Sequence, residues 1–194
     1  TERINIDGKD ISQTDFAAAV QVVSPLVEDM AAAGKERPTE FEMLTAAAFW
    51  YFAQQQVEYA VIEVGLGGLL DSTNVIVPQV AVITNVAMDH MKYCGNTIEE
   101  IAAVKAGIIK EGVPVVTTAE EPALSVIARA AYQKHSHLYA LDHSFEIVGN
   151  AGPEDPAAGQ MITVREKSRY AITTTLPLLG KHQRTNAGAA IMAL

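Results

Sequence analysis

The chain has 194 residues, a formal net charge of −9 and a single cysteine. A net acidic chain is not expected to bind nucleic acid or an anionic membrane non-specifically. One cysteine, Cys94, excludes an intramolecular disulfide and argues against a cysteine-rich zinc site, which fits a cytoplasmic protein. No apolar run approaches the roughly 18 residues that a membrane-spanning helix needs, so the sequence predicts no contact with a membrane.

The first predicted elements are a strand end with a turn at residues 5–9 and two helices. Ser12 is a suitable N-cap for a helix that runs to about Ala33. A loop containing Gly and Pro follows, and apolar residues at helical spacing then predict a second helix over about 40–55.

Short apolar runs then alternate with helical patterns, which predicts an α/β fold: a doubly wound, mostly parallel sheet with helices on both faces. Thr97 and Glu100 have the spacing of a capping box at the start of one such helix. Buried strands are predicted at residues 59–64, 80–86, 114–117 and 137–141, and helices at about 97–110 and 122–134.

The pattern changes after about Asp142, and we divide the chain there into an α/β core (1–142) and a second part (143–194). Apolar runs in the second part predict a small antiparallel β meander, with residues 150–159 as its loop and a last helix opening near His182. The runs lie at 145–148, 161–164 and 170–176.

A Gly-rich segment, Glu63–Asn74, follows the first predicted strand, where open α/β sheets bind ligands. Glu63 is the one charged residue of that run, and a buried carboxylate is costly unless it is paired or bound to a metal. The alternative is a Gly-rich turn with a satisfied glutamate. The G-x-G-x-x-G fingerprint fails because Leu70 stands where its third glycine belongs, which argues against a nicotinamide oxidoreductase.

Two further candidates follow along the chain. Asp89 and His90 come just after the strand predicted at 80–86, although such a pair, considered alone, is more often an ordinary surface loop. Lys105 is the single internal lysine of an apolar helix segment. It could reach the same carboxyl-end cleft, or it could extend its charged end to water as such lysines usually do.

The last candidate is the polar cluster that opens the final helix. Gln183 and Asn186 are three residues apart and share a helical face, and their amides could read the edge of a nucleobase. Ordinary helix-start chemistry would explain the same residues. No G-x-x-x-x-G-K-[ST] phosphate loop occurs in the sequence.

Together these segments resemble the central ATPase domain of the folylpolyglutamate synthase/dihydrofolate synthase family, which is related to the Mur ligases. The similarity spans nearly the whole chain, and its combination of motifs is specific to the family. The matching stretches are residues 2–4, 39–42, 63–74, 89–90, 105–108 and 180–186.

The resemblance implies ATP-dependent ligation of L-glutamate to a folate or to dihydropteroate through an acyl phosphate. It implies Mg²⁺ ligands at Glu63 and His90, although imidazole is an unusual partner for this hard cation. Lys105 would carry a carbamate that helps to hold a second metal. It also implies an adenine site at His182, Gln183 and Asn186, and a pterin-side pocket bordered by Thr39, Phe41, Gly67, Gly68, Asp71, Thr73 and Asn74.

These roles carry geometric expectations. Glu63 and His90 should converge at the carboxyl edge of the sheet, with Lys105 pointing toward them and Lys110 solvated on a different face. The expected partners are small molecules alone, and the protein is expected to be a monomer.

Two residues depart from the family pattern. Leu69 stands where an arginine is usual, which favours folylpolyglutamate synthase over dihydrofolate synthase activity, and Val104 replaces an acidic residue. Both ends of the chain look cut. We therefore expect a fragment that lacks an upstream phosphate loop and a glutamate-binding C-terminal domain, and that does not turn over ATP alone. The alternatives are another Mur-type or cyanophycin-type ligase, or a non-catalytic binding domain derived from one.

Overall fold

The computed structural model describes residues 1–149, 159–167 and 169–194, so most of the loop predicted at 150–159 lies outside the described residues. The chain divides into two compact units, residues 1–65 and 66–194, each of which is described separately below.

The first unit opens with a two-stranded antiparallel hairpin, β1 (Asn5–Ile6) and β2 (Lys9–Asp10). Asp7 and Gly8 form its turn with φ angles of 51° and 76°. A left-handed conformation at both positions is characteristic of tight hairpin turns, so the predicted turn is confirmed.

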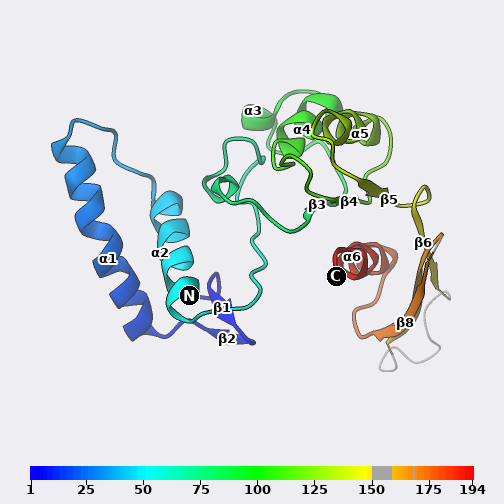
Figure 1. Ribbon diagram of the computed structural model, residues 1–194, viewed down its shortest axis with the longest axis horizontal. Coiled ribbons are helices and arrows are strands. Elements are labelled where there is room, and N and C mark those ends of the chain that lie inside the picture. The colour runs from blue at the N-terminus through cyan, green and yellow to red at the C-terminus, as the bar shows by residue number, and fades with distance from the viewer. Residues whose placement is uncertain (150–158, 168) are drawn as a thin grey trace. The chain divides into compact units, whose positions relative to one another are not determined.

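Two helices form the rest of this unit, α1 (Gln13–Ala32) and α2 (Glu40–Gln54), and they run side by side (Figure 1). The Ser12 hydroxyl accepts a hydrogen bond from the backbone N–H of Asp15, which confirms the predicted start of α1. The small and branched residues Ala19, Val23 and Val27 of α1 pack against Ala47 of α2.

The strand predicted at Tyr59–Val64 is wrong. These residues form no strand, and the side chains of Tyr59 and Val61 are 89% and 99% exposed. A strand needs a neighbouring strand to satisfy its backbone groups, and no described strand pairs with this segment. Apolar composition alone therefore did not decide its structure.

The second unit is built on a parallel sheet of three short strands in the order β3-β4-β5, with β3 at Ala81–Ile83, β4 at Val115–Thr117 and β5 at Leu138–Ala140. The central strand is buried on both faces, because Val115, Val116 and Thr117 are each at most 1% exposed. All three strands lie within predicted runs.

Helices cover both faces of this sheet, as expected for a doubly wound fold. Val115 faces a core formed with α4 (Ile98–Ala106) and α5 (Ala123–Gln133). Val116 points the opposite way, into a core with α6 (Lys181–Ala193) and the meander.

The start and end of α4 differ in detail from the prediction. Thr97 caps the helix by accepting from Glu100 N, but the Glu100 carboxylate accepts from Asn96 N instead of closing the box on Thr97. The helix ends at Ala106, four residues before Lys110, because a turn begins at Gly107.

The predicted meander is confirmed as an antiparallel sheet, β6-β7-β8. Gly188 of α6 lies against Ile147, and a Cβ added there would lie 2.2 Å from Ile147 Cδ1, so a larger residue would require the Ile147 side chain to move. The strands of this meander are β6 (Phe145–Gly149), β7 (Gln160–Glu166) and β8 (Ala171–Leu176).

In the described part of the chain, no helix is long and apolar enough to cross a membrane.

Candidate functional site

The Gly-rich segment of the second unit is a closed loop organised by Asp71. The Asp71 carboxylate accepts hydrogen bonds from the backbone N–H of Leu66 at 2.8 Å and from that of Thr73 at 2.9 Å. The Thr73 hydroxyl also donates to this carboxylate. Asp71 thereby caps a 3-10 turn, Ser72–Val75, and the loop holds its shape through its own side chains.

This loop lies directly on the last turn of α4. The backbone N–H of Leu69 donates to the Val104 carbonyl at 2.9 Å. A Cβ added to Gly68 would lie 2.9 Å from Val104 O and 3.0 Å from Lys105 O. Glycine at this position therefore lets the loop backbone approach the carbonyls at the end of the helix, where α-helices leave acceptors unsatisfied.

Asn74 and Lys110 fasten the other end of the loop. The Asn74 side-chain amide donates to Leu69 O at 2.9 Å and to Gly107 O at 3.1 Å. The Lys110 amine donates to the Asn74 carbonyl at 2.8 Å, and this contact is partly buried. The expectation that Lys110 is solvated is therefore wrong, because the chain has left the helix before residue 110 and turns back toward the loop.

Lys105, the candidate carbamate carrier, sits in the last turn of α4 beside this loop. Its side chain is neither fully buried nor fully exposed. Among the hydrogen bonds and ion pairs of the described residues, none involves its amine.

Asp89 and His90 lie in an exposed loop between β3 and a short helix, α3 (Met91–Cys94). Their side chains are 73% and 57% exposed, and His90 Nε2 lies 3.5 Å from Asp89 Oδ2. His90 has a φ of 50°, a left-handed conformation that is uncommon for residues other than glycine.

Glu63 belongs to the first unit, and its side chain is exposed and outside any strand. The expectation of a buried carboxylate at a strand end is therefore wrong, because the predicted strand does not form. Its convergence with His90 and Lys105 of the second unit stays a prediction. Within the described residues, no cluster of three or more His, Cys, Asp or Glu side chains is placed to hold a metal ion.

The candidate adenine residues lie in the first two turns of α6. Gln183 is partly buried, whereas His182 and Asn186 are exposed. The loop before α6 is held by Gln160, a buried side chain that donates to the carbonyls of Leu178 and Gly180.

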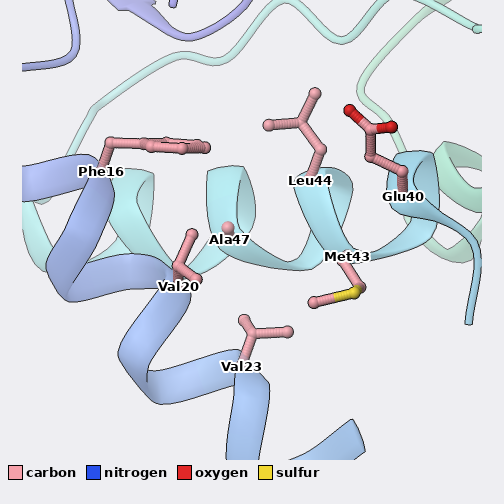
Figure 2. A pocket seen from close by; sticks show the side chains of 7 residues that line it. All are labelled: Phe16, Val20, Val23, Glu40, Met43, Leu44 and Ala47. Carbon is pink, nitrogen blue, oxygen red and sulfur yellow. The ribbon is translucent and has the colours of Figure 1, made fainter. Parts of the chain in front are cut away.

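Thr39 and Phe41 lie at the start of α2 in the first unit. The Thr39 hydroxyl accepts from Glu42 N at 3.2 Å, and Glu42 in turn accepts from Thr39 N at 2.7 Å, which completes a capping box. Phe41 is partly buried. An apolar groove between α1 and α2 does not include it (Figure 2); the groove is lined by Phe16, Val20, Val23, Glu40, Met43, Leu44 and Ala47.

Residues 13–194 match the Mur ligase middle domain family. The chain belongs to this family. It is 40% identical over 193 residues to a dihydrofolate synthase/folylpolyglutamate synthase of Bacillus subtilis (strain 168), a match that covers 99% of this chain and 44% of that protein. The predicted resemblance is therefore confirmed.

Solved structures agree with this assignment of the Mur ligase middle domain. A mutant folylpolyglutamate synthase of L. casei superposes with a TM-score of 0.88 at 38% identity, covering 97% of this chain and 46% of that one. A folylpolyglutamate synthase in complex with AMPPCP and folate gives 0.86 at 40% identity, covering 99% and 47%. The chain thus spans a little under half the length of these relatives.

The structural roles of two residues in this Mur ligase middle domain were missed in the sequence. Lys110 and Gln160 both act on backbone carbonyls, 36 and up to 20 residues away in the chain. The only signal for Gln160 was a polar residue at the edge of a predicted apolar strand. No neighbouring residue in the sequence indicates the role of Lys110, since the carbonyl that it binds belongs to a loop distant in the chain.

Proposed function

We propose that this chain is the nucleotide- and folate-binding part of an ATP-dependent ligase that adds L-glutamate to a folate. The observation that carries the proposal is the likeness, over 99% of the chain at 40% identity, to a synthase solved with AMPPCP and folate. In the proposed reaction, a folate carboxylate oxygen attacks the γ-phosphorus of ATP and ADP leaves. The glutamate amine then attacks the acyl carbon, loses a proton, and phosphate departs.

The folate side is assigned to Thr39, Phe41 and the loop from Gly67 to Asn74. The side chains of Asp71 and Asn74 are hydrogen-bonded to backbone groups of the loop and of the turn that ends α4. The backbone of the loop is therefore the part that we assign to ligand binding. A loop that is already shaped before binding loses less conformational entropy when it binds.

The adenine is assigned to His182, Gln183 and Asn186. An amide offers both a donor and an acceptor, the pairing that an adenine edge requires. Gln183 and Asn186 lie on one face of α6, and the Gln160 contacts fix the chain just before that helix begins.

Glu63, His90 and Lys105 would hold Mg²⁺. The resemblance to the family supports this assignment, and both the Glu63 carboxylate and the His90 imidazole are exposed. A bound divalent cation would neutralise negative charge on the transferring phosphoryl group.

Lys105 contributes through a carbamate in this proposal. Its neutral amine attacks CO₂, a nitrogen–carbon bond forms, and one proton is released to solvent. The product is an anionic oxygen donor, which is the type of ligand Mg²⁺ prefers.

The test is ATP-dependent addition of glutamate to a folate by the full-length natural protein, followed by mass spectrometry of the product and by ADP release. Glu63→Ala should lower kcat strongly and leave the melting temperature almost unchanged, because the side chain is exposed. Glu58→Ala, which removes an exposed carboxylate from the same segment, serves as the control.

The same assay separates the alternatives. Activity on a nucleotide-linked peptide without activity on folate would assign the chain to another Mur-type ligase. Nucleotide binding without turnover on any acceptor would indicate a non-catalytic domain. We expect dihydropteroate to be a poorer acceptor than a folate, because Leu69 offers no cation at the substrate loop.

A further inference from the structure

We infer that Lys110 is a positioning residue that latches the substrate loop to the helix carrying Lys105. This inference rests on the proposed function for its kinetic consequence, and on contacts within the second unit for its geometry. The Lys110 amine donates to the Asn74 carbonyl, so Lys110 acts through Asn74.

The latch is a continuous set of hydrogen bonds. Lys110 Nζ donates to Asn74 O, and the Asn74 amide donates to Gly107 O, at the turn that ends α4. Leu69 N, at the centre of the loop, donates to Val104 O in the last turn of the same helix. The loop and the end of α4 are therefore joined at three points.

The backbone of Lys110 is itself fixed, so the amine is delivered to a defined place. The Ser136 hydroxyl donates to Lys110 O at 3.0 Å, and Val113 N donates to the same carbonyl at 3.1 Å.

Lys105 lies one residue beyond Val104, which receives the loop's Leu69 amide. Any displacement of the loop relative to α4 changes the geometry between the folate-side backbone and the Lys105 amine. Small misplacements of a substrate are costly to catalysis because reacting groups must be aligned. The latch therefore fixes the position of the folate-side loop relative to the Lys105 amine.

The experiment compares Lys110→Met with wild type in the full-length protein. Methionine retains most of the apolar stem but donates no hydrogen bond. The KM for folate should rise about tenfold, the loss expected for a hydrogen bond from a charged donor. The KM for ATP should stay within twofold, because the adenine residues lie on α6. Lys110→Arg, which keeps a cationic donor, should recover most of the affinity for folate.

Lys134→Met is the matched control, since Lys134 is exposed and its amine has no partner among the described residues. Hydrogen exchange supplies a second measurement: the Leu69 amide should exchange at least tenfold faster in Lys110→Met and remain unchanged in Lys134→Met. Should Lys110→Met not fold, Lys110→Leu, which also lacks a hydrogen-bond donor, replaces it under the same criteria.

Three outcomes decide the matter. Unchanged folate KM with a lowered melting temperature would mean a structural role only and would overturn the inference. Equal effects of Lys110→Met and Lys134→Met would do the same. If the wild type fails to ligate glutamate to folate, the proposed function fails, and Leu69 exchange still decides whether the latch exists.

Discussion

Gly107 and Leu69 fit together so closely that no side chain can be added between them. A Cβ built on Gly107 would lie 2.4 Å from Leu69 Cβ and 2.6 Å from Leu69 Cα. Because the obstacle includes the backbone of the loop, no change of rotamer relieves it.

We therefore predict that Gly107→Ala lowers the free energy of unfolding by about 1–3 kcal/mol, as overpacking does. Gly107 has helical φ and ψ, so alanine would otherwise be favoured there by up to about 1 kcal/mol. Steric overlap should outweigh that gain. The measurement is chemical denaturation together with exchange of the Leu69 amide, which should lose protection. Unaltered stability and exchange would show that the loop can shift without cost.

Thr117 and Thr118 should respond in opposite directions to the same substitution. The Thr117 hydroxyl accepts from Ala119 N at 3.1 Å, whereas the Thr118 hydroxyl is buried without a partner in the described structure. Thr118→Val should stabilise the chain by about 1 kcal/mol, since it removes an unsatisfied polar group. Thr117→Val should destabilise it by about 1–3 kcal/mol, because it leaves a buried N–H unpaired. Denaturation of the two variants in parallel tests the pair, and a loss of stability in Thr118→Val would contradict the prediction.

The capping box of α2 predicts a defined pH dependence. Hydrogen bonds from the Thr39 backbone, and then from its hydroxyl, hold the pKa of Glu42 below its usual range. A carboxyl whose folded pKa is depressed stabilises the fold above its unfolded pKa, and this contribution is lost as pH falls through the folded pKa. Wild type should therefore exceed Glu42→Gln in stability near neutral pH and converge with it in acid.

Trp50, which lies in α2 and is the only tryptophan of the chain, reports this difference by fluorescence. Glu40→Gln is the control, since the Glu40 carboxylate makes no hydrogen bond within the described residues. A gap between wild type and Glu42→Gln that persists unchanged in acid would rule out the capping explanation.

Lys105→Ala tests the carbamate in the full-length protein. We expect activity to fall by about tenfold to a hundredfold, the scale of losing a metal-positioning group, and to recover partly when a short carboxylate such as acetate is added. Lys110→Met should show no such rescue, because it lacks a donor and not an anion. Full activity of Lys105→Ala without acetate would exclude the carbamate.

The helices were predictable because their signals are local. Ser12 and Thr39 lie next to the turns they cap, and apolar residues repeat at helical spacing. Pairing of strands is not local, which is why the run at 59–64 was misassigned although the runs around β3, β4 and β5 were correct. The same limit explains Lys110, whose acceptor is 36 residues away.

The candidate site was predictable to a similar degree. The sequence identified the Gly-rich segment and Lys105, and the structure brings the segment onto the turn of α4 that contains this lysine. The sequence did not show that the side chains of Asp71, Thr73 and Asn74 hold the loop together. Most of their partners are backbone groups, which every residue has and which the sequence therefore does not distinguish.

The attachment of the loop to α4 has a consequence for how related sequences can diverge. The carbonyl of residue 104 that accepts from Leu69 N persists whatever side chain that residue carries, whereas residue 107 must remain glycine. An acidic residue at position 104 could thus give way to valine without the loop losing its support. The side chain at position 104 can therefore vary while the hydrogen bond that supports the loop is kept.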